Sequence, residues 1–104
     1  LHLNMDLPYK ISNTVRAESE LESAINYYQE VANDRVAENF INEFVKILDF
    51  IKHFPFQRIY KDNLRGVPMK KYPYIVFYVV DDIEREIIIK GVFNTYQDVS
   101  KYPE

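Results

Sequence analysis

The sequence contains no cysteine, only two histidines and only two glycines in its 104 residues. The absence of cysteine excludes a disulfide framework, a cysteine-based zinc site and a thiol nucleophile, and it fits a reducing cytoplasm. The two histidines, His2 and His53, lie far apart without a third, which makes a weak case for a metal site. We therefore expect no cofactor and no metal ion, and we expect the protein to be cytoplasmic.

No apolar run is long enough for a signal peptide or a membrane span, so the sequence predicts no membrane association. Hydrophobic residues make up 47% of the chain and aromatic residues 15%, which is typical of a compact globular domain. A chain of this length forms one domain. Because a methionine occurs at Met5, we expect an N-terminal extension over residues 1–8 and a single domain over residues 9–104.

The net charge of −3 is distributed unevenly. Residues 1–52 contain five Lys or Arg and nine Asp or Glu. The charged residues of positions 55–80 are mostly basic: Arg58, Lys61, Arg65, Lys70 and Lys71 against Asp62. Such a segment offers the positive charge with which proteins hold nucleic-acid phosphates. A solvated sheet face with ordinary Lys and Arg explains the same charges, and the acidic balance of the whole chain favours that explanation.

The first half of the chain predicts a strand followed by two helices. Residues 9–12 alternate as in a short strand, and residues 12–14 offer capping oxygens for a helix. Asn33 and Asp34 interrupt the helical pattern and can cap a second helix. The first helix has an apolar stripe with spacings of three and four: Ala17, Leu21, Ala24, Ile25, Tyr28 and Val31. The second helix repeats the pattern: Ala37, Phe40, Ile41, Phe44, Val45, Leu48 and Ile51.

After Pro55 the apolar period changes from near four to two, which predicts strands. Residues 57–60 and 67–72 are short stretches of β type separated by a polar run. Residues 74–80 are β-branched or aromatic almost throughout, as in a central strand, and residues 86–93 predict its hairpin partner. This order predicts an α+β domain: an N-terminal strand and an antiparallel helical hairpin packed on one face of a three- to four-stranded antiparallel sheet.

Four patterns carry a resemblance to a known family. They are A-x-x-E-L-x-x-A-I-x-Y-Y over residues 17–28, a second helix that ends in F-P, R-G-V-P-M-K-K-Y-P-Y-I-V-F-Y-V-V-D-D over residues 65–82, and the C-terminal I-I-I-K-G-V-F-N-T-Y-Q-D-V-S-K-Y-P. In this order they resemble the RelE/ParE superfamily of toxins from bacterial type II toxin–antitoxin, or plasmid stabilisation, systems. The resemblance covers the chain from about Tyr9 to Pro103, and the predicted order of elements matches that fold.

The resemblance implies a toxin that inhibits bacterial growth. Members similar to RelE cleave messenger RNA on the ribosome with lysine, arginine and tyrosine side chains, whereas members similar to ParE poison DNA gyrase. Both kinds are neutralised by a cognate antitoxin. Three functions stay open for this chain: a ParE-like toxin that acts by binding, which we favour, a ribosome-dependent mRNA endoribonuclease, and a decayed, non-toxic member that only binds its antitoxin.

The last strand of the family often ends in V-x-H-x-x-R, and the matching positions here are Val92, Asn94 and Gln97. Asparagine and glutamine cannot transfer a proton near neutral pH, as histidine can. They also cannot bind a phosphate through a charged, planar guanidinium, as arginine can. This departure favours a toxin that acts by binding over one that cleaves RNA. We expect the target to be bound by five residues: Arg65, Lys70, Lys71, Asn94 and Gln97.

RNA cleavage would need other catalytic groups. The candidates are Arg65, Lys70 and Lys71 for phosphate stabilisation, with Tyr96 or Tyr102 as the proton donor. Structural roles explain the same residues: Arg65 as the ion-pair partner of an acidic helix residue such as Glu22, and the two lysines as solvated strand residues.

A partner surface is also expected. An antitoxin segment that folds on binding must bury apolar area to offset the entropy that it loses. We expect the outer side of the helical hairpin and the sheet edge to supply this area, and a homodimer to form through the same surface in the absence of antitoxin. Residues 98–103 are expected to be ordered only by a partner.

Overall fold

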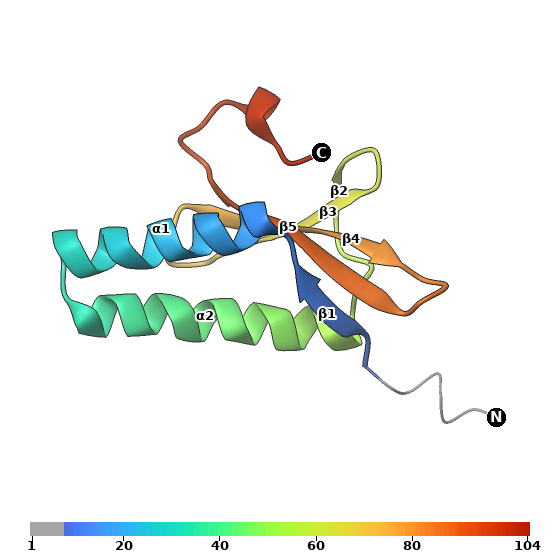
Figure 1. Cartoon of the computed structure of the whole chain (residues 1–104), viewed down its shortest axis with the longest axis horizontal. Helices are drawn as coiled ribbons and strands as arrows, with labels where there is room; N and C mark the ends of the chain where they lie inside the picture. The colour runs from blue at the N-terminus through green and yellow to red at the C-terminus, as the bar shows by residue number, and fades with distance from the viewer. Residues whose placement is uncertain (1–7) are drawn as a thin grey trace.

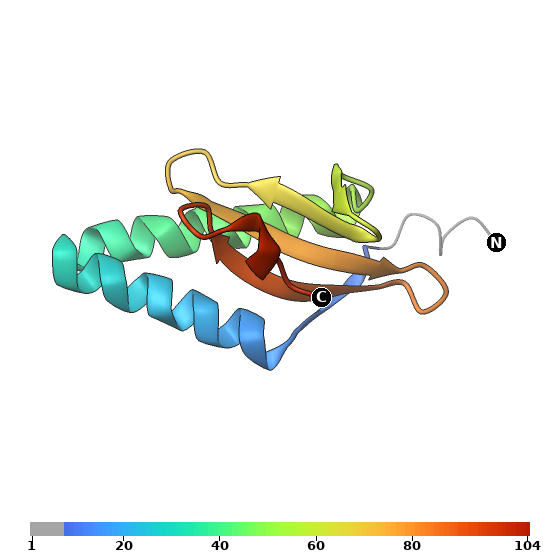
Figure 2. The ribbon, with the colours of Figure 1, turned by 90° about the horizontal axis from the view of Figure 1, so that it is seen from above.

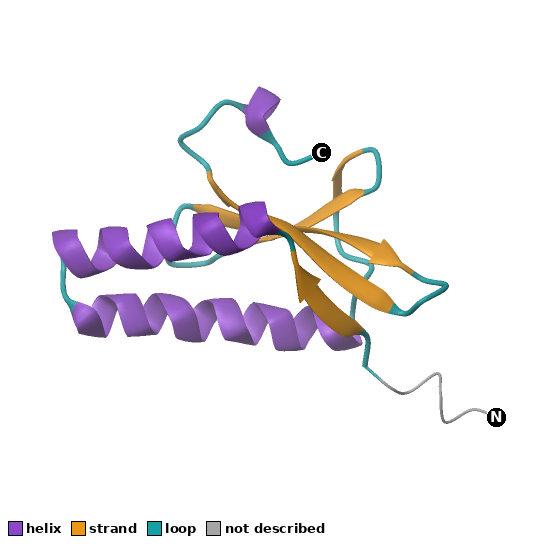
Figure 3. Cartoon of the chain, viewed as in Figure 1, coloured by secondary structure: helices purple, strands orange, loops and turns teal. Residues whose placement is uncertain are grey.

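The computed structural model describes residues 8–104, so His2 and nearly all of the expected extension over residues 1–8 lie outside the described residues. Figure 3 shows long helices packed beside a sheet. The elements are β1 (Lys10–Asn13), α1 (Val15–Val31), α2 (Asp34–His53), β2 (Ile59–Lys61), β3 (Leu64–Pro68), β4 (Tyr74–Asp81), β5 (Glu86–Asn94) and the short 3₁₀ helix η2 (Val99–Lys101). No helix within residues 8–104 is long and apolar enough to cross a membrane.

Side-chain caps begin both helices where the sequence predicts them. The Oγ1 atom of Thr14 accepts a hydrogen bond from the backbone N–H of Ala17 at 3.1 Å and also donates to the carbonyl of Ile89. Asn33 caps α2 in the same way, because its Oδ1 atom accepts from the N–H of Val36 at 2.9 Å. Each cap satisfies an N–H group that has no partner inside its helix. The two helices are separated by only two residues and pack against each other, so they form the predicted hairpin.

The apolar stripes of the two helices differ from the prediction at three positions. Val31 and Val45 were placed on the buried faces but are 59% and 53% exposed. Ile47, which the predicted stripe omits, is only 8% exposed and joins the core with Phe44 and Ile51. A helix turns 100° per residue, so the stripe drifts around α2 and Ile47 faces the sheet where Val45 does not.

The sheet is mixed and has the strand order β1-β5-β4-β3-β2. Strands β2 to β5 form the predicted antiparallel meander. The N-terminal strand β1 adds to it parallel to β5, with Lys10 opposite Glu86. The parallel pairing follows from the topology, since the helical hairpin carries the chain across one face of the sheet between β1 and the meander. Strand β4 lies in the centre, as its apolar composition predicts.

The boundaries of β2 and β3 differ from the predicted ones. The stretch predicted over residues 57–60 starts two residues later, and the one predicted over residues 67–72 is strand only to Pro68. The turn between the strands is tight, and Asp62 adopts a left-handed φ of 52° there, a conformation that Asp tolerates better than most residues. Consequently β3 begins at Leu64, and residues 69–73 form a loop.

Both faces of the sheet are covered. The helices cover one face, and the C-terminal segment with η2 crosses the other (Figures 1 and 2). On that second face Leu64, Ile75, Phe77 and Phe93 form an apolar cluster against which Tyr102 packs. Tyr102 and Pro103 thus pack against their own chain, and Arg16 binds the carbonyl of Lys101, contrary to the expectation that only a partner orders residues 98–103.

One hydrogen bond links the C-terminal segment to the helical layer. The Nη2 atom of Arg16 in α1 donates to the carbonyl of Lys101 at 2.6 Å. Beside it, Gly91 leaves no room for a side chain, because a Cβ atom there would lie 2.8 Å from Oε1 of Glu20 and 3.2 Å from Cγ of Pro103. The same Glu20 oxygen accepts from the N–H of Val92 at 3.0 Å. The C-terminal segment, α1 and β5 are therefore fitted closely together.

Candidate functional site

Two segments that are distant in the sequence meet at one end of the sheet. The N–H and the hydroxyl of Thr95 both donate to the carbonyl of Pro73, at 2.8 and 3.1 Å. These bonds hold the β3–β4 loop, residues 69–73, against the turn that follows β5, residues 94–97. We refer to these two segments together as the loop–turn surface. It brings together four residues from the predicted site: Lys70, Lys71, Asn94 and Gln97.

The two lysines lie in the loop and not in a strand as predicted, and both are exposed. The backbone N–H of Lys70 donates to Oε2 of Glu43 at 2.6 Å, which ties the loop to α2. Because neither lysine sits in a sheet ladder, the alternation of side chains across a strand does not apply to them. Both ammonium groups are free to approach a partner from the side of the loop.

Asn94 and Gln97 shape the turn after β5. The Oδ1 atom of Asn94 accepts from the N–H of Tyr96 at 2.9 Å, and its carbonyl accepts from the N–H of Gln97 at 3.0 Å. This is the local pattern with which Asn stabilises turns. Gln97 is exposed, and Tyr96 is 87% exposed. The polar ending of β5 thus forms an ordered turn that presents Tyr96 and Gln97 to solvent.

Arg65 does not join this surface. It lies near the start of β3, where its Nη1 atom donates to the carbonyl of Gln57 at 2.7 Å and its guanidinium lies 5.1 Å from the ring centre of Phe56. The expected ion pair with Glu22 is wrong: among the described residues the salt bridge within 4.0 Å joins Arg16 and Glu20 instead. The guanidinium of Arg65 is therefore used to fix the segment between α2 and β2.

Tyr102 also lies apart from the loop–turn surface. Its ring centre is 4.7 Å from that of Phe77 and 4.9 Å from that of Phe93, on the sheet face opposite the helices. The five candidate catalytic residues are consequently divided among three places: the start of β3, the loop–turn surface and the C-terminal segment. Within residues 8–104 no group of three or more His, Cys, Asp or Glu is placed to hold a metal ion.

An aromatic cluster supports the loop–turn surface from inside. The ring of Phe40 in α2 lies 5.1 Å from that of Tyr72 and 5.3 Å from those of Tyr28 and Tyr74. The sequence places Tyr28 and Tyr74 in the core or at its rim, which the burial confirms. It does not reveal that Tyr72, in the loop beside Lys71, joins them. The sequence Tyr-Pro-Tyr of residues 72–74 could have indicated this, because side chains two residues apart can lie on the same side of the chain.

The tyrosines of the core should titrate late. Burial raises the pKa of both Tyr28 and Tyr78 to about 12, and the Tyr78 hydroxyl also donates to the carbonyl of Pro55 at 2.6 Å. A tyrosine in an unfolded chain has a pKa near 10, so the folded state keeps these two protons to higher pH. Their contribution to the free energy of unfolding is therefore complete below about pH 10 and is lost as the pH rises towards 12.

An ultraviolet titration of phenolate formation checks this expectation. Two of the nine tyrosines should ionise last, near pH 12 and together with unfolding. Tyr78→Phe should remove one late step. Ionisation of all tyrosines near pH 10 in a protein that stays folded would contradict the assignment.

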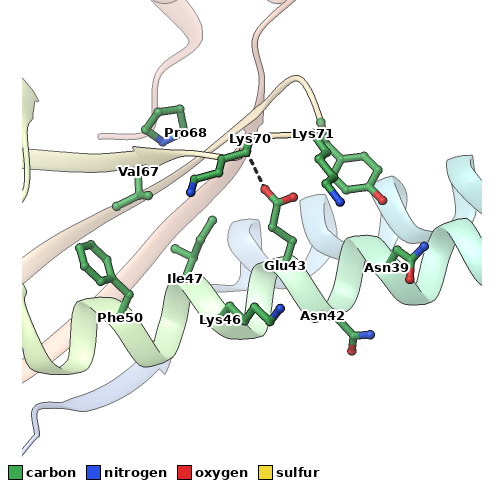
Figure 4. A pocket seen from close by; sticks show the side chains of 11 residues that line it. Asn39, Asn42, Glu43, Lys46, Ile47, Phe50, Val67, Pro68, Lys70 and Lys71 are labelled. Atoms are coloured by element: carbon green, nitrogen blue, oxygen red, sulfur yellow. Dashed lines mark hydrogen bonds between the residues drawn. The ribbon is translucent and has the colours of Figure 1, made fainter.

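A groove runs along α2 beside the loop–turn surface. It has a volume of about 660 Å³ and lies between α2 and the segment formed by the end of β3 and the following loop. Figure 4 shows the side chains that line it, including Lys46, Ile47 and Phe50 from α2 and Lys70 and Lys71 from the loop. The two lysines of the predicted site therefore belong to both the groove and the loop–turn surface.

Two solved structures with a similar arrangement of elements come from toxin–antitoxin systems. A structure of the chromosomal ParDE system from P. aeruginosa matches with a TM-score of 0.72 and 13% identity, over 83% of this chain and 95% of that chain. The RelBE2 toxin–antitoxin complex from Mycobacterium tuberculosis matches with a TM-score of 0.56 and 16% identity, over 85% and 99%. At these identities the matches show the fold alone. No curated protein matches the sequence.

The sequence itself matches a family model. Residues 11–99 match the model described as the ParE toxin of the type II toxin–antitoxin system parDE. Because this match spans most of the chain, the chain belongs to the ParE toxin family. The resemblance to the RelE/ParE superfamily that the four sequence patterns carry is thereby confirmed, and so is the predicted fold.

Proposed function

We propose that this chain is a toxin that acts by binding a cellular target, with DNA gyrase as the first target to test, and that a cognate antitoxin neutralises it. Membership of the ParE toxin family supports the toxin role. The similar structures come from the ParDE system and the RelBE2 toxin–antitoxin complex, which supports an antitoxin as partner.

Two of the five candidate catalytic residues, Arg65 and Tyr102, lie apart from the loop–turn surface that carries Lys70, Lys71 and Tyr96, and this separation favours binding over RNA cleavage. A proton donor and a phosphate-stabilising cation must both reach the reacting phosphate. Tyr102 is packed against Phe77 and Phe93, and the guanidinium of Arg65 is bonded to the Gln57 carbonyl. Neither residue is placed to work with the lysines of the loop–turn surface.

The loop–turn surface supports a binding role better. Lys70, Lys71 and Gln97 are exposed there on segments that hydrogen bonds hold in place. A surface that is ordered before it binds loses little conformational entropy on association. We propose that these residues, with Tyr96 and the half-buried Asn94, contact the target, and that Arg65 supports the fold.

Controlled induction of the chain in a bacterial host without antitoxin tests the proposal. We expect growth arrest by the wild-type chain. The variant Lys70→Ala/Lys71→Ala/Gln97→Ala should restore colony formation by about tenfold or more, because loss of a lysine contact typically weakens a charged interface by about that factor. The control variant Lys10→Ala/Lys61→Ala/Gln29→Ala changes the same residue types at exposed positions outside this surface and should still arrest growth.

Two further assays on the arrested cells and the purified protein identify the mechanism. Inhibition of DNA supercoiling by purified gyrase, without cleavage of messenger RNA, is the expected result. Messenger RNA cleavage that Tyr96→Phe abolishes would instead favour the endoribonuclease. Normal growth with soluble, folded wild-type protein would contradict the proposal and favour the decayed member that only binds an antitoxin.

A further inference from the structure

One edge of the sheet is open to another strand. Within residues 8–104, β2 is the last strand in the order and pairs with β3 alone (Figure 1). The N–H of Gly66 in β3 donates to the carbonyl of Arg58 at 3.0 Å, and Ile59 is the next residue along the chain. Neighbouring residues of a strand direct their backbone groups to opposite sides. The N–H and the carbonyl of Ile59 therefore point away from β3, towards the open edge.

The opposite edge of the sheet lies against the end of α2. Strand β1 forms that edge, and directly before it the N–H of Tyr9 donates to the carbonyl of Lys52 in α2 at 3.1 Å. This arrangement leaves β2 as the edge that another molecule can approach. Because a molecule with one such edge can pair once, pairing between copies ends at a dimer and does not continue into a fibre.

Apolar side chains lie along the segment that leads from α2 into β2. Phe54 is 62% exposed, Phe56 57% and Ile59 50%. The guanidinium of Arg65 lies 5.1 Å from the ring centre of Phe56, and Arg65 is also the strand partner of Ile59. At about 200 Å² for a phenylalanine, the three exposed side chains present roughly 300 Å² of apolar surface. Apolar surface of this extent beside an open strand edge favours an interaction site.

The sequence around Ile59 is compatible with a second copy of the same strand. In an antiparallel pair with a two-fold axis at Ile59, the Ile59 residues of the two copies exchange two backbone hydrogen bonds. Arg58 then faces Tyr60 of the second copy, and Gln57 faces Lys61. No cation lies directly opposite another, and an arginine beside a tyrosine ring is a favourable contact. Within its own chain the Arg58 guanidinium already lies 4.4 Å from the ring centre of Tyr60.

We propose that two copies of this chain associate through β2, with Ile59 on the two-fold axis, so that their sheets join into one. Tyr60 belongs to the cluster on the sheet face opposite the helices, so its neighbour Ile59 points to the helix side and packs there against Ile59 of the second copy. The interface lies beside the start of β3, whereas the loop–turn surface follows its end. The dimer therefore presents that surface twice. This association goes beyond the proposed function and does not depend on it.

The size of the interface predicts a weak dimer. Two copies contribute roughly 600 Å² of apolar side-chain surface, which corresponds to about 1,000 Å² in total because interfaces are about 60% apolar. Interfaces at this lower limit dissociate in the micromolar range. Each copy has a net charge of −3, and Arg58 and Lys61 of both copies come close to the axis. Since salt screens repulsion between like charges, the dimer should become tighter as salt rises.

Sedimentation equilibrium of the purified full chain tests the proposal. The chain should pass from monomer to dimer between about 1 and 100 µM. Ile59→Lys places two ammonium groups side by side and should weaken the dimer by about tenfold or more. The control Ile83→Lys makes the same change in the β4–β5 turn, where Ile83 is 95% exposed, and should change the dimer less than about twofold. A monomer at every concentration, or equal effects of the two variants, would overturn the proposal.

A single introduced cysteine tests the register of the two strands. The natural chain contains no cysteine, so a disulfide formed by such a variant joins two copies. Opposite residues of a hydrogen-bonded pair have Cα atoms about 5.5 Å apart, within the range of a disulfide. Ile59→Cys should therefore become a covalent dimer on mild oxidation. Arg58→Cys, whose two copies are offset along the strands, and Ile83→Cys should stay largely monomeric.

Circular dichroism confirms that each cysteine variant is folded. Faster cross-linking of Arg58→Cys or Ile83→Cys than of Ile59→Cys would place the contact elsewhere and contradict the proposal. A folded Ile59→Cys protein that stays monomeric on oxidation would do the same.

Single-stranded nucleic acid is the alternative occupant that Arg58, Lys61 and the exposed rings could bind. A fluorescent oligonucleotide added to the purified chain tests it. We expect no binding at physiological salt, together with a dimer that salt strengthens. If the oligonucleotide binds, its affinity falls as salt rises, and Arg58→Ala/Lys61→Ala abolishes it, the edge serves nucleic acid and the dimer is rejected.

Discussion

Replacement of Phe40 by alanine is expected to lower the free energy of unfolding by about 3–5 kcal/mol, the range typical of a fully buried phenylalanine. Phe40 is 0% exposed, and its ring contacts those of Tyr28, Tyr72 and Tyr74 at 5.1–5.3 Å. Truncation removes these ring contacts and leaves a cavity between α2 and the sheet. Since small domains are stable by about 5–15 kcal/mol, this one change removes a large fraction of the total.

Urea unfolding of the purified chain measures the effect. The control Val45→Ala changes an apolar residue of the same helix that is 53% exposed, and it should cost less than about 0.5 kcal/mol. Phe40→Ala should also speed hydrogen exchange in residues 69–73, because Tyr72 anchors that loop to the helix. A loss of stability below about 1 kcal/mol, with unchanged exchange in the loop, would show that Phe40 does not support the loop–turn surface.

The sequence was a reliable guide to features that depend on near neighbours. Thr14 and Asn33 begin their helices because a short polar side chain can reach an N–H group two or three residues along the chain. Such a signal is complete within four residues. The central position of β4 could likewise be predicted, because a strand that is buried on both faces is apolar at nearly every position.

Features that depend on distant contacts were predicted less well. The parallel pairing of β1 with β5 joins residues more than seventy positions apart, and nothing in Lys10–Asn13 encodes its partner. The start of β3 depends on the left-handed turn at Asp62, which its neighbours Lys61 and Asn63 do not distinguish from an ordinary loop. An error of this kind moved Lys70 and Lys71 into a strand, although they lie in a loop.

The residues of the predicted site come together only in part for the same reason, and their role stays a prediction. Lys70 with Lys71 and Asn94 with Gln97 are each local in sequence, but only the bonds from Thr95 to Pro73 bring the two pairs together. The expected partner surface, on the outer side of the helical hairpin and the sheet edge, stays a prediction, and the groove lies between α2 and the end of β3 with the following loop. Its lysine lining was not foreseen, because Lys46 and Lys71 come from elements whose relative placement the sequence does not reveal.

Replacement of Tyr102 by alanine is the second change with a large expected effect on stability. A conservative replacement of the same residue tests the mechanism. Tyr102→Ala removes a ring that lies 4.7 Å from Phe77 and 4.9 Å from Phe93 and uncovers an apolar cluster on the sheet. Because Tyr102 is partly exposed, we expect a loss of about 2–3 kcal/mol, less than for a fully buried ring, together with a tendency to aggregate. Urea unfolding and light scattering measure the two effects.

The conservative variant Tyr102→Phe separates packing from chemistry. It keeps the ring contacts with Phe77 and Phe93 and removes only the hydroxyl, so the free energy of unfolding should change by less than about 0.5 kcal/mol. A toxin that acts by binding through the loop–turn surface should arrest growth equally well with Phe at this position. If folded Tyr102→Phe protein no longer arrests growth, the hydroxyl donates a proton in the reaction, and the chain is an endoribonuclease whose C-terminal segment must move to expose that residue.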